Sequence, residues 1–201
     1  MAITYPSSYQ RVNTSTDYDA SAYFPYLSFN GTSSSMTTNS IDFSYGDKMF
    51  VSAGVRKLSD AAIGAVIETS VNSNSNNGAV WLLAPGSPAL DQYSFRSKGI
   101  TASDANATGY SAPTTNVLSG IGNISGDQSI LRINGTQAAI STADQGTGNY
   151  GNYPLYIGAR AGTSLFFNGR LYQMIVAGKQ ANAVEISETE KYINSKTAAY
   201  V

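Results

Sequence analysis

Residues 164–176 read SLFFNGRLYQMIV, and this stretch decides the fold class. From residue 170 onward the side chains alternate between two faces. One face carries Arg170, Tyr172, Met174 and Val176, and the other carries Leu171, Gln173, Ile175 and Ala177. This period of two predicts a β-strand with at least one buried face. The dipeptide Asn168-Gly169 just before it favours a tight turn, because both residues tolerate positive φ.

The segment that follows predicts the one helix of the chain, near Ala183–Thr197. Asn182 suits the N-cap position, and Glu185, three residues later, completes a capping box. Two sets of side chains define the faces of this helix. The docking face carries Ile186, Tyr192 and Ile193, and the solvated face carries Glu188, Glu190, Lys191 and Lys196. Docking of the helix onto its own domain is therefore favoured over binding of a partner.

The remaining sequence predicts many short strands joined by turns. Further β-prone runs cover 26–29, 36–43, 49–55, 63–69, 80–84, 93–97, 117–124, 129–133, 136–141 and 155–159. Alternation orients two of them: Met49, Val51, Ala53 and Val55 share a face, and Val80 and Leu82 face away from Trp81 and Leu83. Asn134-Gly135 is the strongest hairpin signal, whereas residues 98–115 are polar and predict turns. This pattern predicts an all-β sandwich of two antiparallel sheets, without a repeat or a second domain.

The composition limits the chemistry that this 201-residue chain can perform. It has no cysteine and no histidine, which excludes disulfides, thiolate catalysis, histidine-based triads and most zinc sites. Lys and Arg number 12 and Asp and Glu number 13, so the net charge is −1, without a basic patch for nucleic acid or a membrane surface. No apolar run approaches the roughly 20 residues that span a bilayer.

A strand reading F-N-G-x-[LI]-Y, a polar turn and a short capped helix together resemble the concanavalin A-like, laminin-G-like jelly rolls. The resemblance is closest to the version found in phage and prophage tail proteins, and it extends from about Tyr18 to Val201. Three segments carry it: PLYIGARAGTSLFFNGRLYQMIVAG (154–178), DKMFVSAGVRKLSDAA (47–62) and LRINGTQAA (131–139). It implies a jelly-roll domain over residues 26–201, preceded by an extended arm or linker over residues 1–25.

The resemblance also implies a function. The expected role is a non-enzymatic phage virion module, the distal adhesive domain of a tail fibre or tail tip that binds host surface polysaccharide. Such a domain is assembled in the bacterial cytoplasm and exposed on the particle, and fibre association suggests a homo-oligomer such as a trimer. The alternative is a capsid or tail decoration protein whose arm and tyrosines bind neighbouring virion subunits. Neither role involves nucleic acid, membrane insertion or a cofactor.

The carboxylates of the chain do not supply glycoside hydrolysis, which this fold hosts elsewhere and which needs two carboxyl groups close together. Three of the four glutamates lie in the predicted helix. The fourth, Glu68, has Val66 and Ser70 as its neighbours on the same strand face, and neither is an acid. No catalytic residue is predicted.

A metal site is not predicted either. The related phage domains often carry F-D-G-x-D-D on an early strand, whereas residues 29–34 here read FNGTSS, so every acid is replaced by a neutral polar residue. Asp17 and Asp19 form one D-x-D pair, which suits turn capping better than a cation. Asp42 and Asp47 flank a turn.

Carbohydrate binding needs less from the sequence: an aromatic platform for the C–H faces of a sugar and amide groups for its hydroxyls. Aromatic residues lie in or beside three polar loops, 72–78, 98–115 and 145–152. The candidate sugar-binding residues are Trp81, Tyr110, Tyr150, Tyr153, Asn76 and Asn77. They form a site only if the three loops gather at one rim. Packing or subunit contact is the competing role for each tyrosine, and a place in the inter-sheet core is the competing role for Trp81.

Overall fold

The structure, a computed structural model, describes residues 24–88 and 90–201. The predicted arm therefore lies almost wholly outside the described residues, together with Asp17 and Asp19. The described part contains strands β1 (Leu27–Asn30), β2 (Met36–Asp42), β3 (Lys48–Lys57), β4 (Ala65–Thr69), β5 (Ala79–Leu83), β6 (Tyr93–Lys98), β7 (Ala102–Ala107), β8 (Thr114–Asn123), β9 (Gln128–Ile133), β10 (Thr136–Ser141), β11 (Asn152–Ile157) and β12 (Asn168–Ala177), and helix α1 (Ala183–Thr197).

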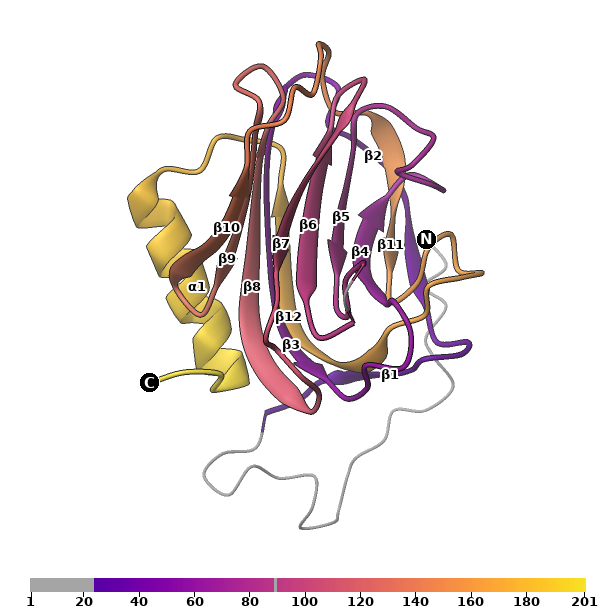
Figure 1. Cartoon of the computed structure of the whole chain (residues 1–201), viewed down its shortest axis with the longest axis vertical. Helices are drawn as coiled ribbons and strands as arrows, with labels where there is room; N and C mark the ends of the chain where they lie inside the picture. The colour runs from indigo at the N-terminus through magenta and orange to yellow at the C-terminus, as the bar shows by residue number, and fades with distance from the viewer. Residues whose placement is uncertain (1–23, 89) are drawn as a thin grey trace.

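The strands form two six-stranded sheets packed face to face, as the alternation pattern predicts (Figure 1). Sheet 1 has the order β1-β12-β3-β8-β9-β10, and sheet 2 has the order β2-β11-β4-β5-β6-β7. Every pairing between these strands is antiparallel. The predicted hairpin at Asn134-Gly135 is confirmed, since the two residues join β9 to β10 with φ values of 51° and 81°.

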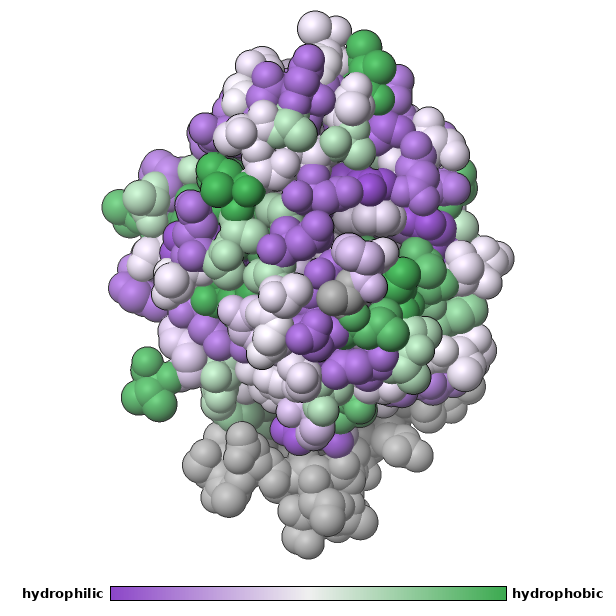
Figure 2. All heavy atoms as spheres, in the orientation of Figure 1, coloured by the Kyte–Doolittle hydropathy of each residue, from purple (hydrophilic) through white to green (hydrophobic). Residues whose placement is uncertain are grey.

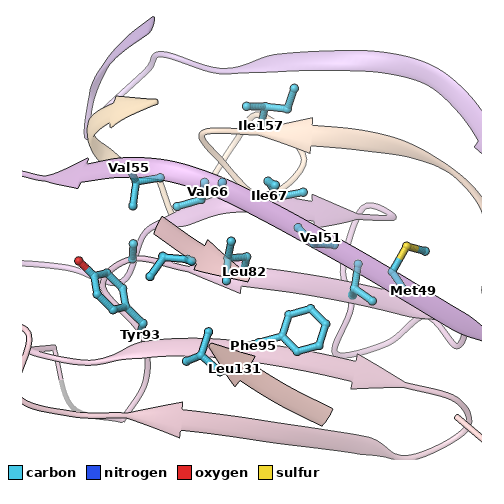
Figure 3. Packing of buried hydrophobic residues seen from close by; sticks show 14 of the residues in the cluster. Met49, Val51, Val55, Val66, Ile67, Leu82, Tyr93, Phe95, Leu131 and Ile157 are labelled. Atoms are coloured by element: carbon cyan, nitrogen blue, oxygen red, sulfur yellow. The ribbon is translucent and has the colours of Figure 1, made fainter. Parts of the chain in front are cut away.

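The predicted alternation places the core correctly. Met49, Val51, Ala53 and Val55 of β3 all belong to one buried cluster, together with Val80 and Leu82 of β5 (Figure 3). Phe95, Leu131 and Ile157 reach the same cluster from other strands of both sheets. One apolar layer thus holds the two sheets together, and burial of these side chains is the main favourable contribution to folding.

Strand β7 was not predicted, because its sequence ASDANA lacks β-branched and aromatic residues. Its inward side chains are small: Ala105 and Ala107 join the core, and Ser103 is fully buried. Pairing with β6 along its whole length compensates for this weak preference. The prediction of turns over residues 98–115 was therefore wrong for residues 102–107.

The predicted tight turn at Asn168-Gly169 was also wrong. Both residues lie in β12, where Asn168 pairs with Asn30 of β1 and Gly169 pairs with both Phe29 and Lys57. A Cβ at Gly169 would overlap the ring of Phe167 and the carbonyl oxygen of Arg56. Glycine is present here because neighbouring atoms approach the backbone closely, and not because the chain reverses.

A β-bulge interrupts the alternation of β12. The register with β3 shifts between Leu171 and Gln173, so one extra residue is inserted. Leu171 faces the inter-sheet core before the bulge, and Met174 and Val176 pack against the same core after it. The two faces predicted for this strand therefore exchange at Tyr172.

Helix α1 covers the outer face of sheet 1, on the side of the sandwich away from β4 and β11 (Figure 1). Its capping box is present as predicted: the Asn182 side chain accepts from the backbone of Val184 and Glu185, and Glu185 accepts from the Asn182 N–H. Ile193 is completely buried, and a Cβ at Gly54 of β3 would overlap Thr197. The helix therefore docks on its own sheet, as expected.

Two residues of α1 are placed differently from the prediction. Glu190 is buried rather than solvated, because Arg132 of β9 holds its carboxylate through Nε at 2.8 Å and Nη2 at 3.0 Å. Tyr192 was expected on the docking face, but it is 47% exposed and lies beneath the ammonium group of Lys196. No helix among residues 24–88 and 90–201 is long and apolar enough to cross a membrane.

Candidate functional site

One row of side chains crosses the outer face of sheet 2 from edge to edge. Registered neighbours on successive strands define it: Thr37 (β2), Tyr156 (β11), Glu68 (β4), Trp81 (β5), Arg96 (β6) and Asp104 (β7). We name this set the Trp81 row. Directly opposed residues in antiparallel strands have Cβ atoms about 4.5–5.5 Å apart, so each member can contact the next. Backbone hydrogen bonding of the sheet thus determines the order of these groups.

Trp81 lies on the outer face because Val80 and Leu82, its neighbours in sequence, fill the core. Its ring is 8% exposed, and it shares a small apolar cluster with Ala65 and Leu83. The guanidinium carbon of Arg96 lies 3.8 Å from the ring centroid, a close cation–π contact. The alternative of an inter-sheet core position for Trp81 is therefore excluded.

Arg96 is held firmly in this position. Its Nε and Nη2 donate to the two carboxylate oxygens of Asp104 at 2.6 and 2.7 Å, and its Nη1 donates to the side chain of Asn74. A bidentate pair of this kind fixes the plane of the guanidinium as well as its position. Since all three of these nitrogens have partners, the charge of Arg96 is largely used within the protein.

A second guanidinium lies over the row from outside the sheet. Arg160 belongs to the β11–β12 connection, where its backbone forms an isolated bridge with Ser164. Its Nε donates to both oxygens of Glu68, at 3.1 and 2.9 Å, and its guanidinium carbon lies 5.1 Å from the centroid of Trp81. Glu68 has no exposed surface, so this ion pair is buried on the carboxylate side.

The β4–β5 loop, residues 70–78, is tied to the same face. The backbone N–H of Ser73 donates to Glu68 at 2.7 Å, and Lys98 donates to the carbonyl oxygen of Asn74 at 2.7 Å. Burial, and secondly the charge of Arg96, lowers the pKa of Lys98. The loop therefore lies against the middle of the row, and Arg160 keeps 14% of its side-chain surface exposed.

Several buried polar atoms of this face have no hydrogen-bond partner among the described residues. They are Trp81 Nε1, Arg160 Nη2, Ser70 Oγ and Ser73 Oγ. Buried polar atoms are paired in the great majority of cases, so each exception calls for a cause. Arg56 Nε and Gln145 Oε1, outside this set, are also buried without a hydrogen-bond partner, so such atoms are not confined to this face. The side of the molecule drawn in Figure 2 is a mosaic of hydrophilic and hydrophobic residues.

The described residues contain no cluster of side chains that could hold a metal ion. No group of three Asp or Glu side chains converges anywhere within residues 24–88 and 90–201. Glu68 is engaged by Arg160 and Ser73. In the segment FNGTSS, the Asn30 side chain accepts from the backbone N–H groups of residues 32–34 at 2.9–3.0 Å, so it stabilises a turn.

Three of the predicted sugar-binding residues lie near one another at the rim. Tyr153 donates its hydroxyl to the carbonyl oxygen of Asn77 at 2.9 Å, and Asn76 is the neighbouring loop residue. Parts of all three predicted loops meet there, because Gly78 of loop 72–78 forms backbone hydrogen bonds with Gly99 of 98–115 and with Gly151 of 145–152. This rim and the Trp81 row are joined by the β4–β5 loop, which contacts Tyr153 through Asn77 and Arg96 through Asn74.

The other two predicted tyrosines do not join that group. Tyr150 is a core residue with 2% exposure, and its hydroxyl lies 2.6 Å from that of Ser97; burial raises the pKa of Tyr150 well above its usual value. Tyr110 stacks on Tyr93, at the end of β6 opposite to Gly99. Because strand β7 spans the distance between Gly99 and Tyr110, the loop predicted over residues 98–115 reaches both ends of the sandwich.

Sequence reasoning missed Arg96, Asp104, Arg160 and Tyr156 as members of a site. Alternation does place Arg96 opposite to Phe95, on the face of Trp81, so part of the signal was present. The contact of Arg160 with Glu68 could not be predicted from local patterns, because 92 positions separate the two residues in the sequence.

Comparison with known proteins identifies the fold. No protein-family model and no curated protein matches the sequence. Among solved structures, a heptameric SAP-like pentraxin from Limulus polyphemus aligns with a TM-score of 0.61 and 11% identity over 82% of this chain and 81% of that chain. The IT-sialidase CBM40 of Ruminococcus gnavus, bound to α2,3-sialyllactose, aligns with a TM-score of 0.53 and 14% identity over 77% and 97%.

The binding domain of botulinum neurotoxin serotype D aligns with a TM-score of 0.62 and 12% identity, over 86% of this chain but only 43% of that chain. The chain thus spans less than half of the neurotoxin domain. Identities this low establish a shared fold and nothing finer. The two six-stranded antiparallel sheets, the single terminal helix of the described residues and these alignments together show that the chain is a concanavalin A-like jelly-roll sandwich.

Proposed function

We propose that this chain is a non-catalytic carbohydrate-binding domain that uses the outer face of sheet 2. The carrying observation is the Trp81 row, in which a tryptophan ring, two guanidinium groups and two carboxylates lie together on the outer face of sheet 2. Tyr156 supplies partly exposed aromatic surface, and Thr37 and Arg160 supply hydrogen-bonding side chains that keep some exposed surface. These are the elements that carbohydrate recognition requires.

Two further observations support this proposal. Structures with a similar fold include sugar-bound domains, among them the CBM40 with sialyllactose and a neurotoxin DC binding domain in complex with SialylT. In addition, α1 covers the outer face of sheet 1, and no helix of the described residues covers the outer face of sheet 2. The engagement of Glu68 by Arg160 and by the backbone of Ser73 favours binding over hydrolysis.

The sequence resemblance supports a finer proposal: an adhesive domain exposed on a phage particle, in a tail fibre or tail tip, that binds host polysaccharide. In that setting the domain acts as part of a homo-oligomer, and copy number multiplies weak single-site affinity. A capsid or tail decoration role is the second candidate. It is favoured by the tyrosine-rich residues 1–25, which could bind neighbouring subunits.

Binding to an array of bacterial surface polysaccharides tests the proposal. The purified chain is applied as a monomer and clustered on beads, and the Tyr156→Ala variant is compared with the parent. We expect clustered binding that falls about tenfold in Tyr156→Ala, since loss of a stacking aromatic costs about 1 kcal/mol or more. Tyr192→Ala is the matched control, because Tyr192 is an exposed tyrosine on α1.

Two outcomes would count against the proposal. If neither the monomeric nor the clustered chain binds any polysaccharide, the decoration role is favoured. That role predicts binding to purified capsids or tails that depends on residues 1–25. Equal losses in Tyr156→Ala and Tyr192→Ala would leave glycan binding intact but would place it away from the Trp81 row.

A further inference from the structure

We propose that two arginines on the outer face of sheet 1, Arg56 and Arg170, bind the acidic segment 17–19 of the same chain through Asp17 and Asp19. This site lies on the opposite side of the sandwich from the Trp81 row, and the inference does not depend on the proposed function. Its ligand is a pair of peptide carboxylates, and its effect is to attach the N-terminal part of the chain to the domain that follows it.

The two arginines lie side by side in the sheet. Arg170 of β12 is the registered partner of Arg56 of β3, and the two strands are neighbours (Figure 1). Val55 and Leu171, their neighbours in sequence, belong to the inter-sheet core, so both arginines lie on the outer face. Directly opposed residues in antiparallel strands have Cβ atoms about 4.5–5.5 Å apart, and like charges at this spacing are destabilising. An anion bound beside them would offset this repulsion.

Arg56 differs from other arginines of the domain because it holds no carboxylate. Arg96, Arg132 and Arg160 each donate from Nε to a carboxylate oxygen, at 2.6, 2.8 and 2.9 Å. The Nε of Arg56 is buried and has no hydrogen-bond partner within residues 24–88 and 90–201. Because Arg56 as a residue is only half-buried, a carboxylate can approach its guanidinium from the solvent.

The acidic side chains of the described part are already engaged. Of the 13 Asp and Glu residues of the chain, all but Asp17 and Asp19 are described. Each of the others accepts a hydrogen bond from a residue other than Arg56. Asp17 and Asp19 are therefore the acids left to supply its carboxylate, and arginine–carboxylate hydrogen bonds are among the strong ones.

The chain enters the fold beside the arginine pair. Tyr26 directly precedes β1, and the guanidinium carbon of Arg170 lies 4.5 Å from the centroid of its ring. Tyr172 packs edge-on against the same ring, with 5.7 Å between the centroids. Asp19 precedes Tyr26 by seven positions, and seven extended residues span up to about 25 Å. The length of the chain therefore allows the acidic segment to return to the arginines.

A nitroxide label beside the segment tests the proposal in the full chain. The sequence contains no cysteine, so Thr16→Cys creates a single labelling site next to the acidic segment. The label broadens the amide signals of nearby residues in the nuclear magnetic resonance spectrum. We expect Arg56 and its registered neighbour Thr115 to lose most of their signal intensity. Glu68, on the outer face of the other sheet, should keep its intensity.

Charge variants then identify the contact. In the labelled chain, Asp17→Asn combined with Asp19→Asn should restore the intensity at the arginine pair. Arg11→Gln is the matched control, because it removes a charge from the same part of the sequence and keeps both carboxylates. Arg56→Gln should weaken the broadening from the other side of the contact. Lys196→Gln, which removes an exposed cation of α1, should leave the broadening unchanged.

Three results would overturn the proposal. The first is no broadening, or equal broadening on the outer faces of both sheets. The second is broadening that survives removal of both carboxylates, which would show that charge does not hold the segment. The third comes from mixing labelled chains with unlabelled ¹⁵N chains: broadening of the ¹⁵N signals would show that the segment binds a second copy. None of these results involves a glycan, so this proposal and the proposed function can fail separately.

Discussion

Glu68 and Arg160 are the residues on which the outer face of sheet 2 depends most. The carboxylate of Glu68 has no exposed surface, and Arg160 supplies both of its short contacts with a charged group. Removing one partner of a buried pair leaves an uncompensated charge and costs about 3–5 kcal/mol. Replacing both partners by apolar side chains of similar volume is often neutral.

Variants of Glu68 and Arg160 test the contribution of this ion pair to stability. Glu68→Gln should lower the free energy of unfolding by about 3 kcal/mol, and the double variant Glu68→Met with Arg160→Met should lower it by less. Chemical denaturation monitored by circular dichroism measures both. A double variant that is less stable than Glu68→Gln would show that the pair itself contributes net stability.

Asp47 gives a prediction for acid conditions. Its side chain accepts from Lys48 Nζ at 2.7 Å and from the backbone of Ser125 at 3.2 Å, and these hydrogen bonds lower its pKa from 3.8 to about 2. Because the folded pKa lies below the unfolded one, the stabilisation is complete above about pH 5 and disappears as the pH falls through 3.8 towards 2.

We therefore expect Asp47→Asn to be less stable than the parent at neutral pH, and the difference between them to shrink below about pH 4. Thermal unfolding across a pH series measures it. Asp144→Asn, which changes an aspartate in an exposed turn, serves as the control. A difference that stays constant from neutral to acid pH would contradict the assigned role of Asp47.

At the scale of elements, the N-terminus of α1 is the clearest case of a local sequence signal. Asn182 accepts from Val184 and Glu185 at 2.9 and 3.0 Å, and the last turn of the helix packs on Gly54 of β3. We expect Asn182→Ala to lower the free energy of unfolding by about 1 kcal/mol, the usual cost of losing an N-cap.

Asn106→Ala is the matched control for this prediction, since Asn106 is an exposed asparagine on strand β7. It should change stability by less than about 0.5 kcal/mol. Denaturant midpoints of the two variants give the comparison directly. If both variants lose the same free energy of unfolding, the capping box contributes no more to stability than an ordinary exposed side chain.

Elements also show how far the sequence could predict the structure. Turn residues and alternation are local, so they located eleven of the twelve strands and the helix closely. Strand β7 was missed because its pairing with β6 outweighs its own weak preference. The bulge in β12 depends on the register with β3, which no local pattern contains.

The same reasoning explains the partial prediction of the site. Trp81 was named from its type and its place beside a polar loop, but Arg160 comes from a connection 79 positions further along the chain. Tyr150 was named on the same grounds and proved to be a core residue. Proximity to a polar loop in sequence does not decide on which side of a strand or turn an aromatic ring lies.

At the scale of the whole molecule, one buried cluster draws side chains from both sheets. Such a core is expected to unfold in one cooperative step. Far-ultraviolet circular dichroism and the fluorescence of Trp81, which reports from the outer face of sheet 2, should therefore give the same denaturation midpoint. An earlier midpoint for Trp81 would show that the β4–β5 loop and the Arg160 connection open before the sandwich does.

The Trp81 row also carries a consequence for misfolding. Its five neighbouring pairs follow from the register of five strand pairings, and a slip of one residue in a strand moves every side chain of that strand to the opposite face. A slipped β5 would turn Trp81 into the core and Val80 towards the solvent. The row therefore forms only when every strand of the sheet has the correct register. Binding of a ligand at the row would report that the whole sheet is correctly aligned.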